Sequence, residues 1–148
     1  MENWTIRRAD VRDANGLSRC FDAAYAQYAA RIDDLPPMSE NCAEEIAKYL
    51  VWVAEAGGTI VGGLVLVPSD GFLLLANVAV HPTNRGAGLG RRLLTLAETE
   101  AKDRGYAEMR LNTHADMPEI IRLYERNGWL QEGQEGKKVT MRKELPRS

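Results

Sequence analysis

The chain has 148 residues, of which 45% are hydrophobic and 27% charged, and its formal net charge is −2 at pH 7. These values are typical of one globular domain, here residues 1–148, and exclude a disordered or fibrous chain. The charges are interspersed, the start lacks the apolar stretch of a signal peptide and no apolar run could span a bilayer, so we expect a cytoplasmic protein without nucleic-acid or membrane partners.

The first forty residues predict a strand, a long helix and a loop. The strand is expected at residues 4–9. Asp10, with Asp13 three residues later, is a capping pattern for a helix that ends near Arg31. Two prolines in residues 32–38 cannot continue a helix, so this segment is expected to be a loop. The buried stripe of the helix is expected to contain Val11, Ala14, Leu17, Phe21 and Tyr25.

The middle of the chain predicts a short helix and three strands. Asn41, with Glu44 three residues later, forms the pattern of a capping box, and the helix is expected to end near Tyr49. A Gly57-Gly58 turn then joins two strands of a hairpin. A nearly unbroken apolar run follows and predicts a central strand covered on both faces. The three strands are expected at residues 51–55, 59–67 and 72–80.

The last third predicts two helices and three strands. An amphipathic pattern indicates a helix over residues 88–104, closed by Gly105. Asp116 is expected to cap a second helix that has Pro118 in its first turn and ends near Gly128. Strands are expected at residues 108–113, 129–132 and 139–143. The alternation of strand and helix periods favours an α/β or α+β sandwich.

Three glycines follow the central strand directly and lead into the amphipathic helix. Gly86, Gly88 and Gly90 lack a Cβ that would block the required dihedrals or hold the backbone away from a ligand. Free backbone N–H groups at the positive end of a helix form an anion site. Glycines at such a junction also serve simply to permit a tight turn. The dinucleotide and nucleoside-triphosphate patterns do not fit, because the third dinucleotide glycine is replaced by Arg91 and Gly-Lys-Ser/Thr is absent.

The segment Val78-Ala79-Val80-His81-Pro82, followed by Arg85-Gly86-Ala87-Gly88-Leu89-Gly90, resembles the acetyl-CoA motif of the GNAT superfamily of N-acetyltransferases. The later segment from Leu123 to Trp129 is similar to the second signature of that family. The order of elements agrees over nearly the whole chain. The resemblance implies an α/β (α+β mixed sheet) fold with about seven strands and about four helices, in which strands 72–80 and 108–113 splay apart to admit the pantetheine arm.

The resemblance also implies that acetyl-CoA is the co-substrate and that backbone groups near Val78 and Val80 bind its pantetheine. The N–H groups from Gly86 to Arg91 would bind its pyrophosphate, and one N–H near Val78 would stabilise an oxyanion. The implied cofactor-binding residues are Val78, Ala79, Val80, Arg85, Gly86, Ala87, Gly88, Leu89, Gly90 and Arg91.

The implied reaction moves an acetyl group to a primary amine of a small molecule or peptide by direct attack through a tetrahedral intermediate. Tyr124 resembles the tyrosine that protonates the leaving thiolate, and its alternative role is that of a packed aromatic residue. Strand carboxylates that often act as the base in this family correspond to Ala76 and Asn112, so no base is assigned. A silent acyl-CoA-binding or sensing module on the same fold is the alternative function.

The acceptor is expected to enter over the end of the first helix. Tyr25 and Tyr28 are the expected acceptor-binding residues, with Arg31, Asp33 and Asp34 nearby in sequence. His81 and His114 are weighed as substitutes for the base, and Glu55, Asp33 and Asp34 as groups that act through water, and none is assigned. Cys20 and Cys42 lack the spacing of a metal or redox site, so no metal is expected. A homodimer is left open.

Overall fold

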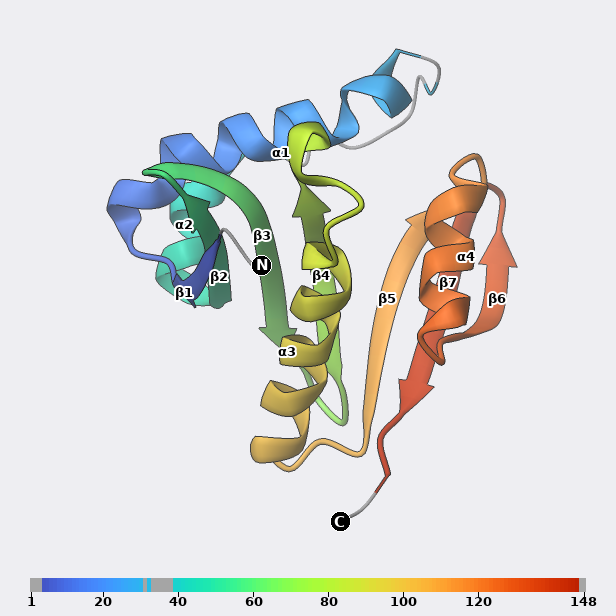
Figure 1. Cartoon of the computed structure of the whole chain (residues 1–148). Helices are drawn as coiled ribbons and strands as arrows, with labels where there is room; N and C mark the ends of the chain where they lie inside the picture. The colour runs from blue at the N-terminus through green and yellow to red at the C-terminus, as the bar shows by residue number, and fades with distance from the viewer. Residues whose placement is uncertain (1–3, 31, 33–38, 147–148) are drawn as a thin grey trace.

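The described part of the chain, residues 4–30, 32 and 39–146 of a computed structural model, forms one seven-stranded sheet with four α-helices (Figure 1). The strand order is β1-β2-β3-β4-β5-β7-β6, and β4 and β5 form the only parallel pair among these described strands. The mixed sheet predicted from the sequence is therefore confirmed. The strands are β1 (Thr5–Arg8), β2 (Leu50–Ala56), β3 (Thr59–Pro68), β4 (Leu73–Val80), β5 (Glu108–His114), β6 (Leu130–Glu135) and β7 (Lys138–Glu144).

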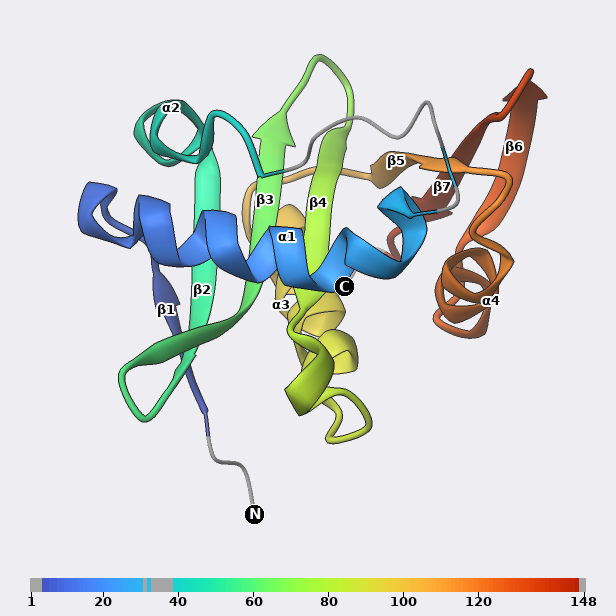
Figure 2. The same ribbon diagram turned by 90° about the horizontal axis from the view of Figure 1, so that it is seen from above.

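Helices cover both faces of the sheet. Figure 2 shows α1 running across β2, β3 and β4. α2 packs beside α1, and together they cover one hydrophobic cluster, whereas α3 and α4 contribute to a second cluster on the other face. The α-helices are α1 (Ala14–Ala29), α2 (Cys42–Lys48), α3 (Leu89–Asp103) and α4 (Pro118–Arg126), and two short 3₁₀ helices are η1 (Val11–Asp13) and η2 (Pro82–Asn84). None of the described helices is long and apolar enough to cross a membrane.

Two adjacent glycines of β3 bring helices close to opposite faces of the sheet. A Cβ at Gly63 would lie 2.4 Å from a methyl carbon of Leu17 in α1. A Cβ at Gly62 would lie 2.9 Å from a methyl carbon of Leu89, the first residue of α3. Successive side chains of a strand point to opposite faces, so these two glycines set how closely α1 and α3 pack.

A β-bulge interrupts the β3–β4 ladder. Val65 pairs with Asn77, whereas the next residue of β3 pairs with Leu75, so Ala76 has no partner across the ladder. The extra residue reverses the alternation of β4. Leu75 accordingly packs in the cluster beneath α3, whereas Ala79 packs in the cluster beneath α1, although both positions would face the same side of a regular strand.

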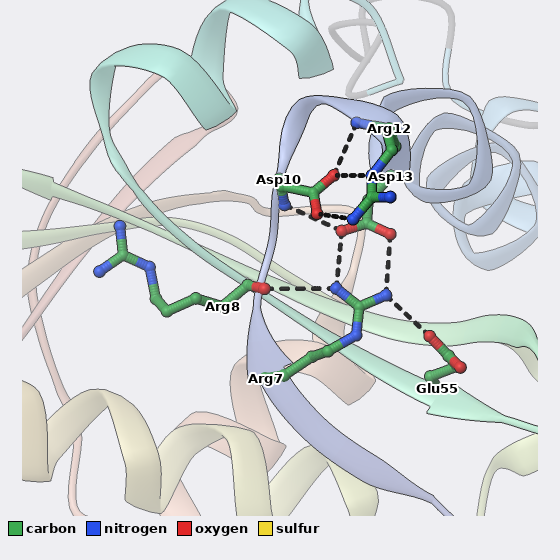
Figure 3. A network of polar contacts seen from close by, with 6 residues as sticks. All are labelled: Arg7, Arg8, Asp10, Arg12, Asp13 and Glu55. Atoms are coloured by element: carbon green, nitrogen blue, oxygen red, sulfur yellow. Dashed lines mark hydrogen bonds and ion pairs between the residues drawn. The ribbon is translucent and has the colours of Figure 1, made fainter.

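A charged network fastens the first strand to the start of α1 (Figure 3). Arg7 donates to both carboxylate oxygens of Asp13, at 2.8 and 2.9 Å, and to Glu55 at 2.7 Å. The Arg7 guanidinium holds the pKa of Asp13 below its ordinary value, more strongly than burial raises it. Asp10 and Asp13 form the expected capping box, but they cap η1 rather than an α-helix. Glu55 is thus a structural ion-pair partner.

Three local predictions are wrong. Val11 was expected on the buried stripe of the first helix, but it lies in η1 and is 66% exposed. Asn41 has a φ of 67° and its side chain does not cap α2. Asp116 does not cap α4, because the N-cap position is Met117, and the Asp116 carboxylate instead accepts from Lys137 at 3.0 Å. In each case a contact or backbone shape set by the fold overrides a local pattern.

Candidate active site

The two central strands separate and leave backbone groups of β4 without a strand partner. β4 and β5 pair only at Leu73–Met109 and Leu74–Arg110, and then diverge, as Figure 1 shows. The N–H of His81 donates to Val61 in β3 at 2.8 Å. Because backbone groups alternate along a strand, those of Val78 and Val80 point away from β3, toward the diverging β5.

A first cavity of about 450 Å³ lies at the N-terminus of α3. Gly88 caps this helix with a φ of 89°, no side chain caps it, and the first intrahelical bond runs from the Arg92 N–H to the Gly88 carbonyl at 3.0 Å. The N–H groups of Leu89, Gly90 and Arg91 therefore have no partner within the helix. Donors at the positive end of a helix dipole suit a phosphate group.

Nearly all of the predicted cofactor residues line this cavity. Nine of the ten do so, and only Ala87 does not. Gly86 and Gly88 have φ values of 85° and 89°, as a strained turn requires. Gly90 does not have a positive φ, and a Cβ there would meet only Val80, at 3.7 Å. The dihedral angles of Gly90 therefore do not require glycine, and the other reason considered, the close approach of a ligand to the backbone, stays a prediction for this position.

Three guanidinium groups make the first cavity suitable for an anion. Among the described residues, Arg85, Arg91 and Arg126 line it, together with one carboxylate, that of Glu119. Arg85 also donates to the backbone carbonyl of Ala24 at 2.9 Å, which ties the glycine loop to the end of α1. Arg126 was not predicted from the sequence, since only the approach of α4 to α3 brings it to the cavity.

A second cavity of about 560 Å³ lies over the diverging ends of β4 and β5. Four of the described residues line both cavities: Tyr25, Val78, Ile120 and Tyr124. A ligand that enters the first cavity can therefore meet a second ligand beside Val78 and Tyr124. Group transfer requires that two reactants meet, and the lining residues shared at this junction of the cavities are compatible with that requirement.

The residues predicted to bind the acceptor occupy different positions. Tyr25 lines both cavities, whereas Tyr28 lines only the first. Burial raises the pKa of Tyr28, and a hydrogen bond with Glu119 raises it further. The remaining candidates, Arg31, Asp33 and Asp34, lie outside the described residues.

Tyr124 is a buried phenol at the junction. Its ring lies 5.8 Å from that of Trp129, between centroids, and its hydroxyl makes no hydrogen bond to the described residues. Burial raises the pKa of Tyr124 above its ordinary value of about 10. The hydroxyl consequently stays protonated at neutral pH and can donate to a ligand atom.

The second cavity contains polar groups that the sequence did not single out. Asn77, Thr113, Glu135, Lys137 and Lys138 line it. Asn77 is buried and accepts a hydrogen bond from the Tyr25 hydroxyl at 2.7 Å. Asn77 could have been recognised in the sequence as the one amide within an otherwise apolar strand. Nothing in the sequence pointed to the lysines as neighbours of this strand, because they lie more than fifty residues further along the chain.

The positions considered for a base differ in access. Ala76, Asn112 and His114 line the second cavity. The His114 Nδ1 accepts a hydrogen bond from the backbone N–H of Asp116 at 3.0 Å. His81 lines neither cavity, and its Nδ1 caps η2 by accepting from the Thr83 N–H. Of the two histidines, only His114 could reach an acceptor.

The two cysteines are unsuited to nucleophilic chemistry. Cys20 and Cys42 are buried and unpaired. Burial raises the pKa of each thiol to about 11, so both stay protonated near neutral pH. Within residues 4–30, 32 and 39–146, no group of three His, Cys, Asp or Glu side chains is arranged to hold a metal ion.

Comparison with known proteins gives a consistent family. A family model described as the acetyltransferase (GNAT) family matches residues 15–129. The IAA acetyltransferase of Azospirillum brasilense is 35% identical over 141 residues, which cover 90% of this chain and 88% of that protein. The L-methionine sulfoximine/L-methionine sulfone acetyltransferase of Salmonella typhimurium is 30% identical over 135 residues, which cover 84% of this chain and 79% of that protein.

The fold also matches solved structures. The PaiA N-acetyltransferase from Thermoplasma acidophilum, solved in complex with coenzyme A, superposes with a TM-score of 0.86. The match covers 97% of this chain and 99% of that one at 22% sequence identity. At this identity the likeness is one of fold.

Proposed function

This chain belongs to the acetyltransferase (GNAT) family and is an acetyl-CoA-dependent acetyltransferase, and from that premise we propose that it transfers the acetyl group to a primary amine by direct attack. The observation that carries the proposal is the junction of the two cavities at Val78 and Tyr124. One cavity has the donors that suit a pyrophosphate, and the other is separate from them and open to a second substrate.

The cofactor residues of this chain suit an extended acyl-CoA. We infer that the N–H groups of Leu89, Gly90 and Arg91 bind the pyrophosphate, since they lack partners within the helix. The outward backbone groups of Val78 and Val80 would pair with the pantetheine amides as those of a neighbouring strand would. The thioester would then lie beside Tyr124.

The proposed chemistry needs no covalent enzyme intermediate. The neutral amine attacks the thioester carbonyl, a C–N bond forms, and the tetrahedral oxyanion accepts a hydrogen bond from the outward N–H of Val78. The C–S bond then breaks, the thiolate receives a hydrogen bond from Tyr124, and the proton lost by the amine balances the one gained by sulfur. Ala76 and Asn112 cannot accept a proton at neutral pH, so we propose that water carries the proton away from the amine.

Release of free thiol from acetyl-CoA tests this function. Purified protein is incubated with acetyl-CoA and a panel of small amines and short peptides, and thiol is followed with a thiol-reactive dye. Amine-dependent release, with the acetylated amine identified by mass spectrometry, is the expected result. Folded protein that binds acetyl-CoA but releases thiol with no amine would instead support a silent acyl-CoA-binding module.

A further inference from the structure

We propose that the acceptor is a small amine that also carries a carboxylate, as an amino acid does, and that Asn77, Asn112 and Lys138 hold this carboxylate in the second cavity. The inference rests on the proposed function, because it names the substrate class of the same reaction. It follows from which polar atoms of the cavity wall are already occupied and which are left to a ligand.

Asn77 presents hydrogen-bond donors to the cavity. It is 4% exposed, and the bulge at Ala76 turns it toward α1, where the Tyr25 hydroxyl occupies its Oδ1 at 2.7 Å. No described residue accepts a hydrogen bond from its Nδ2. Among the described residues only Glu45 Oε1 is a buried side-chain nitrogen or oxygen atom without a partner, so Asn77 Nδ2 reaches the open space of the cavity and can donate to a ligand there.

Asn112 is arranged in the same way, with its side-chain oxygen occupied and its side-chain nitrogen available. Its Oδ1 accepts a hydrogen bond from the Thr140 hydroxyl, directly across the β5–β7 ladder, at 3.2 Å. No described group accepts from its Nδ2. Both amides of the cavity wall thus have their oxygen occupied by a hydroxyl and their N–H groups available. A ligand group that only accepts hydrogen bonds, such as a carboxylate, matches this arrangement.

The charges at the mouth have the complementary sign. Lys137 and Lys138 line the cavity, and Glu135 is the one carboxylate among its described lining residues. Lys137 is paired with Asp116 at 3.0 Å, whereas Lys138 forms no ion pair with any described residue. Lys138 therefore offers a positive charge that a carboxylate can neutralise.

The rest of the wall suits an apolar substituent. Leu75, Ala76, Met117 and Ile120 also line the cavity. A simple alkylamine would fill this region but would offer no acceptor to the N–H groups of either amide, which would stay hydrogen-bonded to water. An amino acid with an apolar side chain satisfies the apolar wall, the amide donors and the lysine together.

Two matched pairs of amines test the proposal. Leucine is compared with 3-methylbutylamine, and phenylalanine with phenethylamine, in the thiol-release assay. The readout is the ratio of kcat/KM for the amino acid to kcat/KM for its decarboxylated partner. The two amines of a pair differ in basicity, so their ratio in one protein is not interpreted by itself. Each amine has the same pKa in every assay, so a difference in the ratio between the wild type and a variant reports on the protein.

Lys138→Glu and Asn77→Asp are the informative variants. Asp at position 77 can still accept from Tyr25 but replaces the N–H donors by oxygen. Each variant is expected to lower the ratio about tenfold, equivalent to about 1.4 kcal/mol. Lys102→Glu makes the same charge change on the exposed side of α3 and is expected to leave the ratio unchanged. A ratio that neither cavity variant lowers would overturn the proposal.

Failure of the proposed function can be distinguished from failure of this inference. If no amine releases thiol, binding of N-acetyl-leucine is measured by ligand-observed NMR. If the wild type binds N-acetyl-leucine and Lys138→Glu abolishes this binding, the carboxylate site is supported even though the proposed acetyl transfer is not. No binding of N-acetyl-leucine and no turnover of either amino acid would overturn the inference itself.

Discussion

Replacing Tyr124 by Phe removes one hydroxyl from the junction of the two cavities. This hydroxyl has no hydrogen-bond partner among the described residues, and the ring packs against Trp129. The substitution therefore leaves no protein group unsatisfied and keeps the aromatic contact. We expect the free energy of unfolding to change by less than about 0.5 kcal/mol.

The expected effect on catalysis follows from the acidity of the buried phenol. A tyrosine has an ordinary pKa of about 10, and burial raises the pKa of Tyr124 further. Complete transfer of its proton to the thiolate is therefore less favourable than it would be for an exposed tyrosine. Tyr124 should therefore act mainly by donating a hydrogen bond to the developing thiolate.

A hydrogen bond to a charged group contributes about 1.5–3 kcal/mol, so Tyr124→Phe should lower kcat by about 10- to 150-fold. Acetyl-CoA binding should change much less. The measurement is single-turnover thiol release, with calorimetry for the cofactor. Tyr106→Phe, which removes a half-buried hydroxyl outside both cavities, is the matched control. An unchanged kcat, with chemistry limiting the rate, would return Tyr124 to a packing role.

Three further outcomes are expected. Gly88→Ala should cost about 1–2 kcal/mol of stability, because an alanine at φ 89° is strained even though its Cβ would meet no protein atom within 4 Å. The same Cβ should hold the pyrophosphate away from the backbone and weaken acetyl-CoA binding at least tenfold by calorimetry, and unchanged affinity would argue against the phosphate site. Asp13→Asn should cost about 1–3 kcal/mol at pH 7 in denaturant unfolding. Arg7 depresses the folded-state pKa of Asp13, so the difference in unfolding free energy between the wild type and this variant should have its full size above about pH 4. It should disappear as the pH falls through the depressed pKa. A difference that persists in acid would contradict the ion-pair account. Finally, kcat/KM should rise with pH toward the pKa of each amine used, and a shared inflection near about pH 6.5 that His114→Gln removes would instead identify a histidine base.

Periodicity predicted the strands and helices, and glycine placement predicted an anion-binding turn, whereas the mixed sheet was implied by the resemblance to the GNAT superfamily. The strand that ends at Val80, the three glycines and the helix to Asp103 are all local signals, so they could be found without knowing the fold. The packing of Gly62 and Gly63 could not, because it depends on which helix residue lies opposite each glycine.

The acceptor side was less predictable for a related reason. Asn77 was placed in a central strand, but its direction depends on the unpaired Ala76 opposite β3. Lys138 reaches the same cavity only because β7 pairs beside β5. Register across the sheet, which no single segment encodes, decides both positions.

Because of the bulge in β4, the number of residues in this strand determines the geometry of the site. A bulge bends its strand and increases the local twist, and here the strand separates from β5 just beyond the last parallel pair. The same extra residue turns Asn77 toward the second cavity. Inserting or deleting one residue between Leu73 and Val80 would therefore alter the gap between β4 and β5 and the direction of the amide together. Variation in acceptor choice should consequently arise by substitution within this strand and by changes in the β6–β7 turn, whereas changes in the length of β4 should be rare among active relatives.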